Sequence, residues 1–194
     1  MCIRDRPTSF GVAKAFRSGE FRDPAVTYGD FFVFNFIMTA GSDLDIRANL
    51  LNPTGVNETI GWGRDNTMRH NNVTFAYWGG DNTGGGRETF YLDRSQFLQA
   101  FPSATSFEFD LRCFWNAVSG GDVITNIDAY QGGSMVLNTS TRVWENPTAD
   151  NDFPASKSAS KQITLQTSNV ETEGQRASRV QVNLSAETIQ FFAN

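Results

Sequence analysis

A glycine-rich loop over residues 78–88 carries the side chains with the clearest chemical potential in this sequence. The stretch reads WGGDNTGGGRE, and its oxygen-bearing side chains are those of Asp81, Asn82, Thr83 and Glu88. The glycines allow positive φ angles and bring carbonyl oxygens, such as that of Gly85, close together. Such oxygens suit a hard cation such as Ca²⁺, which takes roughly six to eight oxygen ligands. An ordinary connection between antiparallel strands has the same composition, so the loop alone leaves both interpretations open.

A second acidic segment lies upstream, where Asp43 and Asp45 flank Leu44. Alternate residues of a strand point to opposite faces, so these two carboxylates share one face and repel each other. Arg47 follows on the same face and could neutralise them through salt bridges. A bound Ca²⁺ could do the same, provided that the fold brings this segment to the glycine-rich loop. The residues alone favour neither salt bridges to Arg47 nor a bound Ca²⁺.

The order and spacing of these segments resemble the TerD-type tellurium-resistance and stress domain. The likeness covers residues 41–115, with GSDLD at 41–45, GDNTG at 80–84, and Glu88 ahead of a Leu-Asp pair at 92–93. That family is a calcium-binding β-sandwich whose ligands lie in a DLD segment and a glycine-rich acidic loop. The resemblance therefore implies Ca²⁺ as the cofactor. Carried over position by position, it implies the ligands Asp43, Asp45, Asp81, Asn82 and Glu88, with backbone carbonyls from residues 83–86, among them Thr83 and Gly85.

The chain departs from the TerD pattern just before Glu88. The family usually carries further acids there, whereas this chain has Gly86 and Arg87, which leaves fewer carboxylates for a second ion. A broader set of motifs, YWGGDNTG at 77–84, DLRCFW at 110–115 and YQGGSMV at 130–136, also resembles uncharacterised phage and bacterial proteins. The first resemblance implies a cytoplasmic protein and the second a virion component.

The composition predicts an all-β protein. Its 194 residues include 17 Phe and 17 Gly, and only 19% are charged, a balance typical of strands joined by tight turns. The net charge of -5 argues against a nucleic-acid partner, because phosphate binding requires a basic surface. The two cysteines, Cys2 and Cys113, do not predict a disulfide framework. No apolar run approaches the length of about 18 residues needed to span a membrane.

Alternating apolar and polar residues predict strands over 44–50 and 106–115. Each strand should have one core face and one polar face. The polar faces carry, respectively, Asp43, Asp45 and Arg47, and Glu108, Asp110 and Arg112. The charged face of the second strand predicts that it is half solvated.

We expect an antiparallel, jelly-roll-like β-sandwich over residues 26–145, with one short helix near 94–101. Asp93, followed three residues later by Gln96, is a variant of the capping box. Pro102 then ends the helix, because the residue before a proline disfavours helical geometry.

The two ends of the chain are expected to lie outside this domain or to have a different structure. Residues 1–6 resemble a translated adapter and are expected to be a non-native leader, followed by an irregular lead-in over 7–25. Residues 146–160, rich in Pro, Asp, Ser and Ala, predict a linker or long loop. Residues 161–194 predict a late hairpin that either completes the sandwich or starts another module of a larger chain or assembly.

The sequence lacks the motifs of common enzyme classes, including the nucleophile elbow, the P-loop and the dinucleotide-binding fingerprint. We therefore expect a non-enzymatic calcium-binding module, stabilised by the ion, that presents a surface to an unknown protein or glycan partner. The alternative is a phage virion structural module or glycan-binding module without metal. The candidate sugar-stacking residues of that alternative are Trp62, Trp78, Trp115 and Trp144. Two or more tryptophans exposed on one side would favour it, because Trp is more often a core residue of a sheet.

Overall fold

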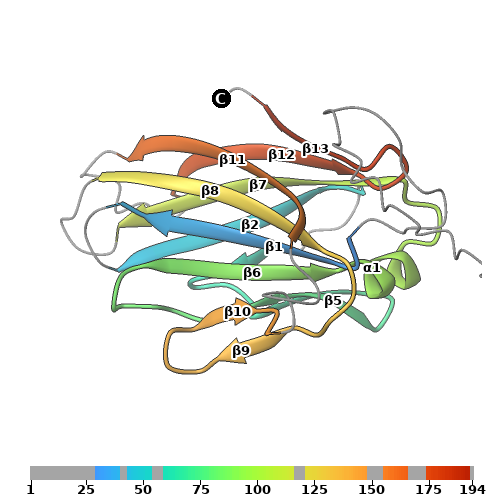
Figure 1. The fold of residues 1–194 in the computed structure, drawn as a ribbon, viewed down its shortest axis with the longest axis horizontal. Helices are drawn as coiled ribbons and strands as arrows, with labels where there is room; N and C mark the ends of the chain where they lie inside the picture. Colours follow the sequence, from blue (N-terminus) through green and yellow to red (C-terminus); the bar gives the residue numbers. More distant parts are fainter. Residues whose placement is uncertain are drawn as a thin grey trace, which may run out of the picture.

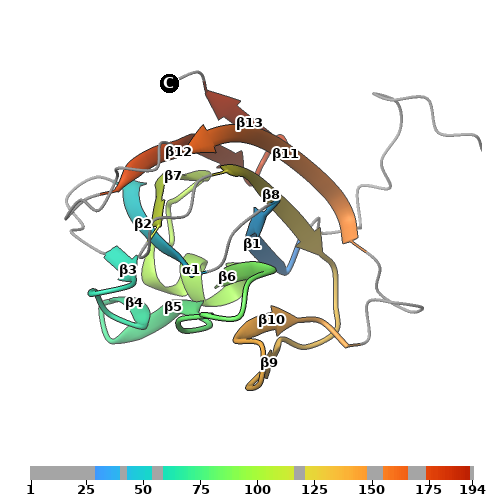
Figure 2. The same cartoon turned by 90° about the vertical axis from the view of Figure 1, so that its left-hand side faces the viewer.

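The chain folds into two antiparallel β-sheets that face each other. The structure is a computed structural model that describes residues 29–39, 43–53, 59–115, 121–147 and 174–192, and the backbone of 155–165. Figures 1 and 2 show the two sheets as the layers of a sandwich that curves around a shared core. The predicted all-β sandwich is confirmed.

One sheet has six strands, the other has five, and a small hairpin lies outside them. In spatial order the first sheet contains β11 (Ala155–Leu165), β8 (Gly121–Tyr130), β1 (Phe31–Met38), β6 (Arg87–Asp93), β5 (Val73–Trp78) and β4 (Thr67–His70). The second contains β13 (Thr188–Phe192), β12 (Gln175–Asn183), β7 (Ser106–Trp115), β2 (Leu44–Asn52) and β3 (Thr59–Gly61). The hairpin consists of β9 (Val136–Asn138) and β10 (Val143–Glu145), and β10 packs beside β6.

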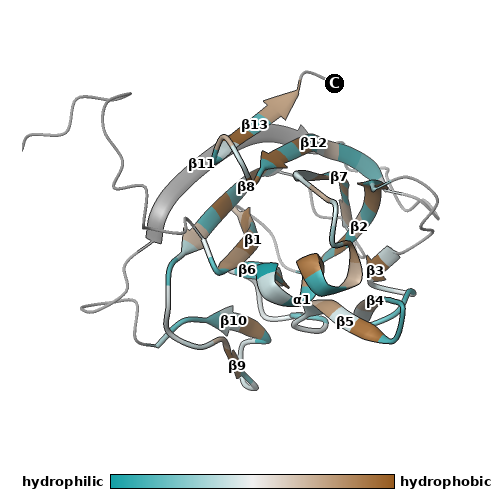
Figure 3. Cartoon of the chain, turned by 90° about the vertical axis from the view of Figure 1, so that its right-hand side faces the viewer, coloured by the Kyte–Doolittle hydropathy of each residue, from teal (hydrophilic) through white to brown (hydrophobic). Residues whose placement is uncertain are grey.

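The core is built on phenylalanine rings from both sheets. Phe34 in β1 is 1% exposed and stacks on Phe90 of β6, with ring centroids 4.2 Å apart. Phe109 of β7 approaches Phe34 edge-on at 5.3 Å and so joins the two layers. The alternation that puts such residues inside is visible along β8 as bands of opposite hydropathy (Figure 3).

The helix α1 (Arg94–Ala100) lies at one end of the sandwich (Figures 1 and 3). Asp93 is its N-cap, because its Oδ1 accepts a hydrogen bond from the Gln96 backbone N–H at 3.0 Å. Phe97 is fully buried and contacts the Phe75 ring edge-on at 5.6 Å. The predicted helix and its cap are confirmed.

Loss of this cap is expected to lower stability modestly. Asp93→Ala should reduce the free energy of unfolding by about 1 kcal/mol, because the N-terminal N–H groups of α1 lose an acceptor. Urea unfolding measures the change. Gln99→Ala, at an exposed position of the same helix, is the matched control and should change stability by less than about 0.5 kcal/mol. Equal losses in both variants would contradict a capping role.

One prediction about the C-terminal part is wrong. Residues 155–160 were expected in a linker, yet they open β11, which pairs antiparallel with β8. Their Ala, Ser and Lys carry little apolar signal, so the strand is defined by the backbone ladder that β8 offers. Within residues 161–194 a hairpin forms between β12 and β13, which pair antiparallel in the five-stranded sheet, whereas β11 joins the six-stranded sheet. These strands complete the sandwich.

The half-solvated face predicted for β7 is wrong as well. Glu108 and Asp110 are 6% and 4% exposed. Arginines cover them: Arg176 Nε lies 2.6 Å from Asp110 Oδ1, and Arg179 pairs with Glu108. Because these arginines come from β12, which pairs with β7, the burial depends on a strand about 70 residues away.

Residues 1–28, which include the predicted leader and lead-in, lie outside the described residues. Within the described residues, no helix has the length and apolar character needed to cross a lipid bilayer.

Candidate metal centre

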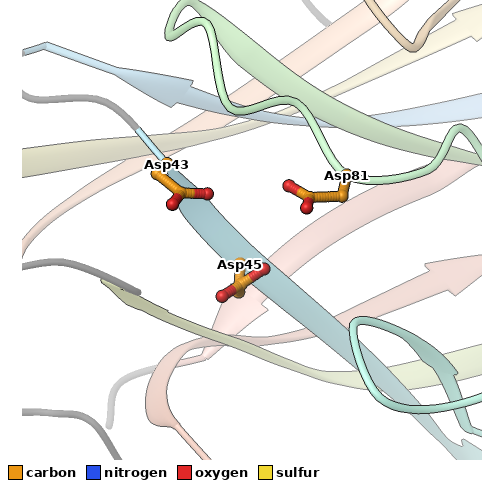
Figure 4. A group of neighbouring side chains, drawn as sticks. All are labelled: Asp43, Asp45 and Asp81. Atoms are coloured by element: carbon orange, nitrogen blue, oxygen red, sulfur yellow. The ribbon is translucent and has the colours of Figure 1, made fainter.

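Three aspartates from the two acidic segments meet at one end of the sandwich, near the starts of β2 and β6. Asp43 and Asp45 lie at the start of β2, and Asp81 lies in the loop that precedes β6 (Figure 4). Each offers a carboxylate oxygen, and these oxygens all lie within 4.8 Å of one another. Asp43 has a φ of 65°, a left-handed conformation that aspartate tolerates better than most residues. The expected convergence of the two segments is therefore observed.

Asp45 is the most unusual member of this acidic cluster, which we define as Asp43, Asp45 and Asp81. Asp45 is fully buried, and within the described residues neither of its carboxylate oxygens accepts a hydrogen bond. Burial, followed by the charges of Asp81 and Asp43, raises the pKa of Asp45 from 3.8 to about 7. A carboxylate of this kind favours either a proton or a cation beside it.

Arg47, the alternative partner for these acids, also makes contacts away from them. Its Nε donates to the Trp62 carbonyl at 3.0 Å, and its guanidinium lies 5.0 Å from the centre of the Phe114 ring. Arg47 lowers the pKa of Asp45, but this is the smallest of the four influences on that group. Neutralisation by Arg47 is therefore partial.

Glu88 lies beside the acidic cluster. It is fully buried; its Oε1 accepts the Asn82 backbone N–H at 2.9 Å, and its Oε2 accepts no hydrogen bond within the described part of the chain. Burial raises the pKa of Glu88 well above its ordinary value, and the charges of Asp45 and Asp81 raise it further. The Asn82 hydrogen bond lowers that pKa, and the Trp78 indole does so more weakly. Glu88 is thus a fourth buried acid beside the three aspartates.

Asn82 and Gly85 hold the loop together. The Asn82 Nδ2 donates to the carbonyls of Gly85 at 2.9 Å and Arg87 at 3.1 Å, and its Oδ1 accepts the Gly84 N–H at 3.1 Å. Thr83 is exposed at the loop tip. Of the predicted ligands, the structure therefore brings Asp43, Asp45 and Asp81 together, places Glu88 next to them, and uses Asn82 and Gly85 within the loop.

Sequence reasoning missed Arg142, which lies in the turn between β9 and β10. A Cβ on Gly79 would lie only 2.0 Å from the Arg142 carbonyl oxygen, and the Arg142 side chain runs past Gly80. Its charge lowers the pKa of Asp81, against the raising effects of burial and Asp43. Only the glycine pair at 79–80 hinted at such a close approach, and no local signal in the sequence identified the approaching residue.

The four candidate sugar-stacking tryptophans do not share one exposed face. Trp62 is 39% exposed, whereas Trp115 is 1% exposed and belongs to the core. Trp78 and Trp144 are partly buried. Trp115 therefore cannot stack on a sugar, and among the four only Trp62 is exposed, so the criterion of two exposed tryptophans on one side is not met.

The fold and the site together define the class of protein: an all-β sandwich with a partly buried acidic cluster where its two sheets meet. The chain matches no protein-family model, no curated protein and no solved structure. The TerD resemblance therefore rests on its motif residues.

Proposed function

We propose that this protein is a non-enzymatic, TerD-like module that binds Ca²⁺ through Asp43, Asp45 and Asp81. The observation that supports this most strongly is Asp45, a fully buried carboxylate whose oxygens accept no hydrogen bond within the described residues. An ionised group in such a place is costly unless an opposite charge compensates it. A divalent cation among the three carboxylates would supply that charge.

The donor set favours calcium over other metals. Every side-chain donor of the acidic cluster is a carboxylate oxygen, the ligand type preferred by hard cations, whereas zinc sites usually contain His or Cys. Ca²⁺ also tolerates irregular geometry, which suits ligands from a strand and a glycine-rich loop. Glu88 and the carbonyls of residues 83–86 are the nearby groups that could complete its shell.

The ion would join the two sheets. Asp43 precedes β2 of the five-stranded sheet and Asp45 lies within it, whereas Asp81 precedes β6 of the six-stranded sheet. A cation held by all three would therefore stabilise the folded state relative to the unfolded chain, in which the ligands are dispersed. It would also hold the loop over residues 79–88 as a defined surface for a partner.

Calcium is expected to raise the melting temperature of the metal-stripped protein. At a concentration about 100 times Kd, binding adds about 2.7 kcal/mol, equivalent to roughly 5 to 10 °C for a chain of this size. Differential scanning calorimetry in EDTA and in millimolar Ca²⁺ measures the shift, with Mg²⁺ as a test of selectivity. An unchanged melting temperature would contradict the proposal.

A matched pair of variants locates the site. Asp81→Ala should abolish the calcium shift, because it removes one of the three converging carboxylates. Asp65→Ala removes an exposed acid between β3 and β4 and should leave the shift intact. A calcium shift that survives in Asp81→Ala would place the ion elsewhere.

A further inference from the structure

A hollow lies on the outer side of the six-stranded sheet, next to the β9–β10 hairpin. Figure 2 shows this hairpin outside the sandwich, beside β6. The hollow has a volume of about 240 Å³. Its lining residues include Asn35, Arg87, Tyr130, Trp144, Glu145 and Asn146. None of the acidic-cluster aspartates lines it, so it is a separate site.

The floor of this hollow, from here on called the groove, consists of hydrogen-bonded polar side chains. Asn35 is 1% exposed; its Nδ2 donates to Asp128 Oδ2 at 3.0 Å, and its Oδ1 accepts from Arg87 Nη1 at 3.3 Å. Asn126 Nδ2 donates to the same Asp128 oxygen at 2.9 Å. An amide has two N–H donors and two lone pairs, so Asn35 retains capacity to donate and accept once more. The groove therefore offers prearranged planar polar groups.

One wall of the groove is a fixed aromatic side chain. The Trp144 backbone N–H donates to Thr89 Oγ1 at 2.8 Å, and its indole contacts the Tyr91 ring edge-on at 4.7 Å. Tyr130 adds a second aromatic ring to the lining. Such rings offer flat apolar surface that loses little entropy when a ligand packs on it.

The charges of the groove do not favour an anion. At the rim, Arg87 Nη2 lies 3.8 Å from Glu145 Oε1, so the cation is partly balanced by an acid. Asp128 adds a negative charge behind Asn35. A phosphate or sulfate site would instead need uncompensated donors or an excess of positive charge.

We propose that this groove binds a neutral carbohydrate of one or two rings. Each sugar hydroxyl both donates and accepts hydrogen bonds, which matches the mixture of amide, guanidinium and carboxylate groups. The apolar C–H face of a sugar ring matches the Trp144 wall. The volume is below the roughly 300 to 1,000 Å³ typical of pockets for drug-sized ligands, which limits the occupant to a small one.

Saturation-transfer NMR with a panel of neutral mono- and disaccharides tests the proposal, with sialylated and sulfated sugars as comparison ligands. At least one neutral sugar should bind, and the anionic sugars should bind more weakly. Trp144→Ala should weaken binding by roughly tenfold or more. Glu145→Ala alters only the exposed rim and should weaken binding several-fold without loss of the fold, while Trp62→Ala should have no effect, because the Trp62 ring contacts Phe114 of β7 in the five-stranded sheet.

The same titration in EDTA separates this site from the proposed calcium site. Sugar binding should persist without calcium, whether or not the calcium proposal holds. Absence of binding to every neutral sugar, preference for anionic sugars, full affinity in both Trp144→Ala and Glu145→Ala, or loss of binding in EDTA would each overturn the assignment.

Discussion

Asp45→Asn is expected to stabilise the ion-free protein by roughly 2 to 4 kcal/mol at about pH 8, and to remove its response to calcium. Both effects have one cause. The ionised Asp45 is buried among like charges, so it destabilises the fold until a cation compensates it. Asparagine has nearly the same shape but carries no charge, and its N–H groups can donate to the neighbouring carboxylates.

The sign of the pH dependence follows from the pKa of Asp45, about 7 when folded and near 3.8 when unfolded. Below about pH 4 the group is protonated in both states and has no effect. Between about pH 4 and pH 7, Asp45 keeps its proton in the folded state but has released it in the unfolded state, so the stability of the fold decreases as pH rises. Above about pH 7 the stability that protonated Asp45 contributes to the folded state is lost. Ca²⁺, which competes with the proton for the Asp45 carboxylate, should then restore stability.

Urea unfolding of metal-stripped wild type and Asp45→Asn between about pH 4 and pH 8 measures this difference. The variant should lack the part of the pH dependence that Asp45 contributes, and its advantage should grow toward high pH. Asp65→Asn, at an exposed turn, is the control and should follow the wild type. A variant that is less stable than wild type at high pH would show that Asp45 is a favourable structural carboxylate, which contradicts this account.

Phe34→Ala is expected to cost about 3 to 5 kcal/mol, a loss of roughly 6 to 20 °C in melting temperature. Phe34 is buried at the centre of the sandwich, stacked on Phe90 and in edge contact with Phe109. Removing the ring loses apolar burial and leaves a cavity between the two sheets, which cannot close because the neighbouring rings are held by their strands.

Denaturant unfolding with an unchanged m value measures the cost of Phe34→Ala. The matched control is Val136→Ala in β9, where the side chain is 49% exposed and the change should be within about 0.5 kcal/mol. A loss below about 1 kcal/mol in Phe34→Ala would mean that the two layers do not pack as described.

Much of this protein could be predicted from its sequence because the deciding interactions are local. The alternation along residues 44–50 identifies the residues of β2 that join the core, although Asp45 and Arg47 on its other face are buried as well. Asp93 caps α1 through a bond to a residue only three positions away. The glycine-rich loop also closes through local bonds of Asn82, whose partners lie within five residues, although the resemblance implied Asn82 as a ligand rather than this role. The two acidic segments were identified as candidate ligands by residue type alone.

Only the tertiary structure decided which distant segments meet. It buried the charged face of β7 under arginines of β12, assigned β11 and β12 to different sheets, and brought Arg142 against the glycine-rich loop. It also brought Asp81 within reach of Asp45, 36 positions earlier in the chain. Strand order and sheet assignment depend on backbone ladders and side-chain packing between remote residues, and no periodicity within one segment records its partner. The acidic cluster and the groove beside Trp144 are therefore products of the fold, whereas the sequence identified the three aspartates and Trp144 as candidates by residue type alone.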